Sequence, residues 1–188
     1  MSDPFFFGYG SLVNRDTHVY ARAHRARVQG WRRAWRHVAP FERAFLTAVP
    51  ARGAVIDGLI AAVPGADWAA LDARETGYAR HRVAEGLAHE AGHDVSAEIY
   101  AVPLDTSRPA SDAHPILLSY LDVVVQGYLR EFGAEGVAGF FATTDGWEAP
   151  VMNDRAAPQY PRHKLLHEAE RDLVDQYLTQ IGARVIPG

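Results

Sequence analysis

Three short segments carry side chains whose types and spacing suit chemistry. The first, His89-Glu90-Ala91-Gly92-His93, matches the pattern His-Glu-x-x-His. On a helix this spacing places two zinc-binding imidazoles one turn apart, with a glutamate base between them. Gly86 and Gly92 each oppose a helix by roughly 1 kcal/mol, and the flanking residues alternate as strands do. We therefore expect a solvated turn at 89–94, with a zinc hydrolase as a rival hypothesis.

Ser11 is the second candidate, because it follows an aromatic run and lies between Gly10 and Leu12. The Gly-x-Ser-x-Gly pattern of a nucleophile elbow is absent, so the hydroxyl is not expected to attack a substrate. Glycines in this position allow a sharp turn that brings backbone amides close to an anion or a carbonyl oxygen. The segment is therefore predicted to act through its backbone.

Glu75 is the third candidate, at the expected end of a short helix. A carboxylate in the last turn faces the negative end of the helix dipole, which tends to raise its pKa and suits proton transfer. The alternative is a surface glutamate paired with Arg74 or Arg80. His163 and His167 are also four residues apart, and we expect them on the surface of a terminal helix.

The strands that must position these residues are predicted from short apolar runs bounded by glycine and proline. A buried strand within 5–12 precedes Ser11. Further strands are predicted over three consecutive segments, 28–38, 45–49 and 55–63. Alternating residues over 82–88 and 95–104 predict a hairpin around the turn at 89–94.

Three helices complete the prediction. Asp67 can cap a helix that ends near Glu75, with Gly77 closing it. Apolar residues at helical spacing predict a second helix from Pro115 to Phe132, ended by Gly133, and a third, amphipathic helix over 162–181. Between the last two, residues 144–162 contain three prolines, which predicts a loop or an extended arm.

Composition excludes several classes of protein. The chain has 188 residues, a formal net charge of -4 and no cysteine. The length fits one globular domain, and the missing cysteines exclude disulfides, a thiol nucleophile and cysteine-ligated metals. No apolar stretch is long enough to cross a membrane and the first residues form no cationic leader. We expect a soluble, cytoplasmic protein that does not bind membranes.

An arginine-rich region is the one place where nucleic-acid binding could begin. Arg25, Arg27, Arg32, Arg33 and Arg36 alternate with Trp31 and Trp35, a mixture that can grip single strands. Lys164 is, however, the only lysine among 19 basic residues, so arginine is the ordinary surface cation of this chain. We expect a solvated strand face and no nucleic-acid partner.

These segments together resemble the gamma-glutamylcyclotransferase superfamily. The resemblance rests on Phe7-Gly8-Tyr9-Gly10-Ser11-Leu12, on Val55-x-x-Gly58-Leu59, and on Leu71-Asp72-x-x-Glu75 followed by Tyr78-x-Arg80-x-x-Val83. Tyr100 and Tyr120 also occur where that superfamily has pocket tyrosines. The resemblance spans residues 5 to about 130. Leu12 stands where some members have Asn, and the gap between Glu75 and Tyr78 is shorter than in several members.

The resemblance implies an α+β fold, a small mixed β-barrel flanked by helices, and the C-terminal arm and helix predicted above are additional to it. We expect residues 1–188 to form a single domain, with a barrel core at 5–143 that holds the catalytic pocket and an appendage at 144–188. The implied catalytic carboxylate is Glu75. The implied substrate-binding residues are Tyr9, Gly10, Ser11, Leu12, Tyr78, Tyr100 and Tyr120.

The reaction implied by the resemblance is intramolecular aminolysis. The α-amino group of a gamma-glutamyl peptide or amine attacks the gamma-carbonyl carbon, which closes 5-oxoproline and releases the next amine. Orientation within one bound molecule, a base and an oxyanion donor suffice for such a step, so no metal or organic cofactor is expected. The expected partner is a small gamma-glutamyl substrate, with the chain acting as a monomer or homodimer. A non-catalytic, ligand-binding member of the same fold is the alternative.

Overall fold

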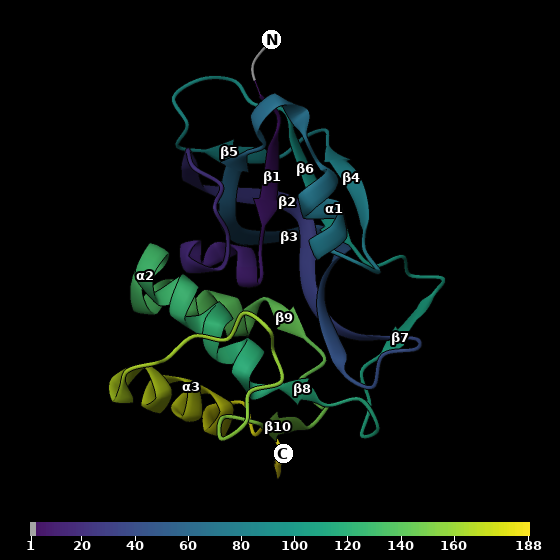
Figure 1. The fold of residues 1–188 in the computed structure, drawn as a ribbon, viewed down its shortest axis with the longest axis vertical. Coiled ribbons are helices and arrows are strands. Elements are labelled where there is room, and N and C mark those ends of the chain that lie inside the picture. Colours follow the sequence, from purple (N-terminus) through teal and green to yellow (C-terminus); the bar gives the residue numbers. More distant parts are fainter. Residues whose placement is uncertain (1–2) are drawn as a thin grey trace.

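A computed structural model describes residues 3–188 (Figure 1). Met1 and Ser2, the first residues of the predicted domain, lie outside the described residues. In chain order the strands and helices are β1 Phe5–Gly8, β2 Ala23–Val38, β3 Ala44–Ala62, α1 Ala69–Arg74, β4 Ala79–Val83, β5 Leu87–His89, β6 Ala97–Ala101, β7 Ser107–Pro109, β8 Ile116–Leu117, α2 Leu118–Ala142, β9 Thr144–Asp145, β10 Val151–Asn153, α3 Glu168–Gln180 and β11 Val185–Pro187.

The main sheet is mixed and curled, and α2 lies across its open side (Figure 1). Its strands follow the order β4-β6-β1-β3-β2-β5, with β7 and β9 also paired to β2. The first strand, β1, runs parallel to β6 and antiparallel to β3. A second sheet of three short strands has the order β11-β10-β8. The predicted α+β class is confirmed, and the barrel is a curled, open half-barrel.

Two long strands replace the three predicted between 28 and 63. Pro50 and Gly53 suggest breaks in the sequence, but β3 continues through them. The pairing of β2 with β3 passes from Gln29 opposite Val55 directly to Trp31 opposite Pro50. Gly30 and Gly53 both have a φ of 80°, a backbone angle that residues other than glycine rarely adopt. The turn signals therefore mark an irregularity that bends a continuous ribbon.

The predicted hairpin is only partly correct. Residues Ala79–Val83 of β4 pair antiparallel with Ala97–Ala101 of β6, which confirms the second predicted strand, whereas the first ends at Val83 instead of at residue 88. The intervening segment Leu87–His89 instead crosses to β2, where Ala88 lies opposite Arg27. Gly86, with a φ of 74°, allows the chain to leave the hairpin at that point.

The second helix begins later and ends later than predicted. Pro115 lies outside it, because Ile116–Leu117 form β8 in the small sheet. Gly133 interrupts the helix with a φ of 68° but does not end it. After this kink, Val137 and Phe140 are buried against the core, so the helix continues to Ala142. None of the helices within residues 3–188 is long and apolar enough to cross a membrane.

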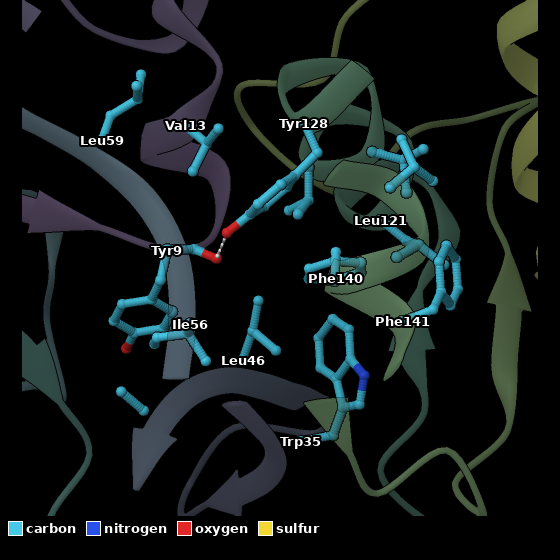
Figure 2. Close-up of a cluster of buried hydrophobic side chains, with 14 of the residues drawn as sticks. Tyr9, Val13, Trp35, Leu46, Ile56, Leu59, Leu121, Tyr128, Phe140 and Phe141 are labelled. Carbon is cyan, nitrogen blue, oxygen red and sulfur yellow. Dashed lines mark hydrogen bonds between the residues drawn. The ribbon is translucent and has the colours of Figure 1, made fainter. Parts of the chain in front are cut away.

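The main core lies between the curled sheet and α2. Trp35 and Leu46 from the sheet side face Phe140 of α2, and the backbone carbonyl of Tyr9 faces the Tyr128 hydroxyl (Figure 2). All five side chains are buried. This packing fixes the loop after β1 against α2, which matters for the site described below.

The terminal helix is shorter than the predicted 162–181. It begins at Glu168, where the Glu170 side chain accepts a hydrogen bond from the backbone N–H of His167 at 2.8 Å. His163 precedes it in an irregular segment, so the two histidines do not share a helix face. Val174 and Leu178 of α3 are buried in the main core.

Asp154 ties the arm at 144–162 to the first turn of α2. Its carboxylate accepts hydrogen bonds from the backbone N–H and the hydroxyl of Ser119, at 2.8 and 2.6 Å. It also accepts one from the backbone N–H of Gln159 at 2.9 Å. The carboxylate thus satisfies a helix N–H group that has no intrahelical acceptor. The arm is held by buried polar contacts although it contains little regular structure.

We expect Asp154→Ala to lower the free energy of unfolding by about 2 kcal/mol, because it removes a buried cap and leaves donors unpaired. Chemical denaturation measures this change. Asp112→Ala is the matched control, since that exposed carboxylate pairs only with Arg184 at the surface and should change stability by less than about 0.5 kcal/mol. Equal losses in the two variants would contradict the capping role.

Candidate functional site

A pocket of two connected parts lies where α1 ends. The outer part is a cavity of about 240 Å³, and the inner part is a recess of about 30 Å³. The residues that line both parts are Ser11, Leu46, Glu75, Tyr78 and Tyr120. All eight residues that the sequence pointed to line the inner recess, where the loop 9–12 meets Glu75 and the three later tyrosines.

Glu75 is the residue that ends α1. Its backbone N–H donates to the Leu71 carbonyl at 3.0 Å, but its φ and ψ of -94° and 40° already leave the helix. Its side chain is 16% exposed. Burial raises the pKa of Glu75 above its ordinary value, and the guanidinium groups of Arg74 and Arg162 offset only part of this rise. A buried carboxylate with a raised pKa is suited to proton transfer.

Arg74 connects Glu75 to the loop after β1. Its Nε donates to Oε1 of Glu75 at 3.0 Å, while its terminal nitrogens donate to the Thr17 carbonyl at 2.6 Å and to the Ser11 hydroxyl at 3.2 Å. The sequence suggested Arg74 only as partner of a surface glutamate. The pairing is present, but it is buried in the pocket wall, and Arg80 pairs with Asp72 instead.

The peptide group between Tyr9 and Gly10 is held by hydrogen bonds to its carbonyl oxygen. Its carbonyl oxygen accepts a hydrogen bond from Nε of Arg33 at 3.0 Å. It also lies 2.9 Å from the Tyr128 hydroxyl (Figure 2), whose single proton it shares with the Asp57 carbonyl at 2.7 Å. The C=O and N–H of a planar trans peptide point in opposite directions. The Gly10 N–H therefore points away from Arg33, as an amide donor to a ligand in the recess must.

Gly10 is required for the close approach of this loop to Tyr120. A Cβ atom at Gly10 would lie 2.6 Å from the Tyr120 hydroxyl oxygen. The Tyr120 hydroxyl donates no hydrogen bond to a protein acceptor within residues 3–188. Its ring meets that of Tyr160 edge to face at 5.0 Å. Burial raises the pKa of Tyr120 well above its usual value, so it remains a neutral donor.

The other three tyrosines use their hydroxyls within the protein. Tyr78 donates to the Leu46 carbonyl at 2.8 Å, and Tyr9 donates to the Tyr100 carbonyl at 2.5 Å. Tyr100 donates to the Asp72 carboxylate of α1 at 2.5 Å. Burial raises the pKa of each of these phenols. They line the recess and brace its walls.

Two other sequence features lie elsewhere. The segment His89–His93 runs from the end of β5 into an irregular turn, so it lacks the helix that the zinc-hydrolase pattern needs. Arg27 and Arg32 pair with Asp57 and Asp145 at the surface, as expected for a solvated face.

Arg33 corrects the expectation of a solvated strand face, because it is only 1% exposed. Arg33 lies two residues after Trp31 and two before Trp35 on β2. Residues two apart in a strand point to the same face, so Arg33 shares the inner face with these tryptophans. The sequence therefore contains the signal that Arg33 is buried, although it does not reveal which residues form hydrogen bonds with Arg33.

Comparison with known proteins identifies the family. The pattern of the family described as "Gamma-glutamyl cyclotransferase, AIG2-like" matches residues 6–120, more than half of the chain. The chain belongs to this family. The matched part of this gamma-glutamyl cyclotransferase, AIG2-like chain includes the loop 9–12, Glu75 and the three later tyrosines. No curated protein sequence matches the chain.

Solved structures share the fold of this family member. A protein titled "Gamma-glutamyl cyclotransferase" superposes with a TM-score of 0.56 at 14% identity, covering 94% of this chain and 99% of its own. An uncharacterized protein from Homo sapiens gives 0.57 at 15% identity, with coverages of 93% and 99%. YkqA from Bacillus subtilis gives 0.55 at 16% identity, with coverages of 73% and 52%. At these identities the likeness supports the fold alone.

Proposed function

We propose that this protein is a gamma-glutamylcyclotransferase that converts the gamma-glutamyl group of a small peptide or amine to 5-oxoproline. The observation that carries the proposal is the position of Glu75. A buried carboxylate with a raised pKa lies beside a glycine-containing loop in a chain of the gamma-glutamyl cyclotransferase, AIG2-like family. General acid–base chemistry and an amide donor therefore meet in one recess.

Glu75 serves as the base and then as the acid in this proposal. The substrate's α-amino nitrogen forms a bond to its own gamma-carbonyl carbon, and the bond from that carbon to the leaving nitrogen breaks. Glu75 accepts a proton from the attacking nitrogen and returns one to the leaving nitrogen, so no proton is gained or lost overall. Holding both reacting groups in one bound molecule removes most of the entropic cost of their encounter.

The loop 9–12 stabilises the negative charge that develops on the gamma-carbonyl oxygen. The Gly10 amide is fixed by the hydrogen bonds to the carbonyl oxygen of the same peptide group, so it needs no reorganisation during the reaction. The Tyr120 hydroxyl, which donates to no protein acceptor within residues 3–188, is a further donor at the same recess. Tyr9, Tyr78 and Tyr100 shape the walls around the gamma-glutamyl group. The reaction as proposed uses no metal or organic cofactor, and the cytoplasm supplies its substrate.

Release of 5-oxoproline tests this function. The purified protein is incubated with glutathione, gamma-glutamyl dipeptides and gamma-glutamyl amines, and the product is measured by mass spectrometry. We expect release from at least one compound, together with an equal amount of the free amine. Saturable binding without release would identify a non-catalytic member of the fold. Stoichiometric zinc that is lost in His89→Ala would restore the hydrolase hypothesis.

A further inference from the structure

The outer part of the pocket is cationic. Three of its lining residues are arginines, Arg43, Arg74 and Arg162, whereas Glu75 is the only acidic residue among those that line it. Arg74 already donates hydrogen bonds to Glu75, Ser11 and Thr17. The remaining two arginines leave this end of the pocket with positive charge that Glu75 cannot balance.

Arg43 and Arg162 form no ion pair within residues 3–188. Other arginines of the chain are ion-paired, as Arg155 is with Asp122 and Asp175. Both pocket arginines are half-buried, and the guanidinium of Arg43 lies 5.9 Å from the ring centre of Phe45. Guanidinium groups bind carboxylates through paired hydrogen bonds, so these two are available to an anionic ligand.

The two arginines lie on one side of the reacting centre. Arg43, at the turn between β2 and β3, and Arg162, from the arm, line the outer cavity but not the inner recess. Glu75 lines both parts. The recess of about 30 Å³ has room for little more than the gamma-carbonyl group, so the outer cavity of about 240 Å³ receives the rest of the substrate, including the leaving group beyond the broken bond.

We propose that Arg43 and Arg162 bind a carboxylate on the leaving group, so that the enzyme prefers gamma-glutamyl amino acids and peptides to gamma-glutamyl derivatives of neutral amines. This inference rests on the proposed function. It also assigns a role to the arm, which lies outside the family match at 6–120. Tyr160 packs on Tyr120, and its backbone N–H donates to the Ser119 hydroxyl at 3.2 Å, which places Arg162 at the cavity.

The test compares gamma-glutamyl-alanine with gamma-glutamyl-ethylamine, which lacks only the carboxylate of the leaving group. For the wild-type protein we expect kcat/KM to favour the alanine compound by about tenfold or more, as a charged hydrogen-bonded contact implies. Arg43→Gln and Arg162→Gln should each lower this ratio several-fold, and the double variant should bring it close to one. Arg52→Gln, at an exposed position outside the pocket, is the control and should keep the wild-type ratio.

The ratio is the decisive quantity because Arg162 also lowers the pKa of Glu75. A change in Glu75 alters both substrates alike and cancels from the ratio. Equal turnover of the two compounds by the wild-type protein would overturn the inference. So would an unchanged ratio in the variants, which would mean that the arginines bind the α-carboxylate common to both substrates.

A binding measurement separates this inference from the proposed reaction. Calorimetric titration of the same two compounds into Glu75→Gln reports recognition without turnover. Tighter binding of the alanine compound, lost when Arg43 and Arg162 are also replaced, would support the carboxylate site even if the wild-type protein released no 5-oxoproline. Equal affinity for both compounds would overturn it.

Discussion

Glu75→Gln is expected to lower kcat about a thousandfold while the protein stays folded, because glutamine keeps the size of the side chain but cannot accept the proton. The assay is the release of 5-oxoproline from the best substrate of the panel. Substrate affinity should change little, since Arg74, Tyr120 and the loop 9–12 remain in place. The loss should therefore appear in kcat rather than in KM.

The pH dependence of wild-type activity should report the ionisation of Glu75. Because Glu75 must be ionised to act as a base, kcat/KM should rise with pH through an apparent pKa above the ordinary value of 4.5. This acidic limb should be absent from any residual activity of Glu75→Gln. A wild-type limb at or below the ordinary value would contradict the buried, desolvated state of Glu75.

Stability gives an independent check on Glu75. A carboxyl whose pKa is raised by folding stabilises the protein below its unfolded pKa, and this contribution is lost as the pH rises through the folded pKa. Relative to Glu75→Gln, the wild-type protein should therefore become less stable as the pH increases above the ordinary pKa of 4.5. Thermal unfolding of both proteins over a series of pH values measures this trend.

Glu90→Gln is the matched control for the catalytic assay. Glu90 is the glutamate of the His-Glu-x-x-His segment, and it lies exposed in the turn after β5. Full activity in Glu90→Gln together with loss in Glu75→Gln supports the assignment of the base. The reverse result would remove Glu75 from the mechanism.

The local part of the site was predictable from sequence. Glycine and aromatic residues predicted the strand and turn that present the loop 9–12, and a short amphipathic segment predicted the helix that ends at Glu75. Those signals depend on residues that are close together in the sequence, so tertiary contacts do not change the elements they predict. The functional importance of these residues came from their resemblance to a family rather than from their spacing.

The distant contacts could not be predicted. Arg74 reaches Thr17, 57 positions earlier in the chain, and Arg162 of the arm lies near enough to Glu75 to lower its pKa. The same limit explains the errors in element boundaries. Gly133 leaves the helical conformation with a φ of 68°, but burial of the apolar residues after it restores the helix.

Arg33→Met is expected to cause a large loss of stability, about 3 kcal/mol or more, because it breaks a buried hydrogen-bond network. The guanidinium donates to the Tyr9 carbonyl at 3.0 Å and to the Thr143 hydroxyl at 2.6 Å, and it also contacts the Asp57 carbonyl and the Tyr128 hydroxyl. Methionine fills a similar volume but donates to none of these groups. Chemical denaturation measures the loss.

Arg32→Met is the matched control, one residue away on the opposite face of β2. Arg32 pairs with Asp145 at the surface, so its replacement should cost less than about 1 kcal/mol. Similar losses in the two variants would show that the network around Arg33 contributes nothing beyond the side chain's volume and the propensity of the strand.

The network around Arg33 also connects stability to catalysis. Tyr128→Phe removes one of the two donors to the Tyr9 carbonyl and leaves Arg33 and the core packing in place. Because those donors fix the direction of the Gly10 N–H, this milder variant should lower kcat more than it raises KM, with the fold intact. An unchanged kcat in a folded Tyr128→Phe protein would mean that the loop 9–12 keeps its orientation without this support, and that the Arg33 network serves stability alone.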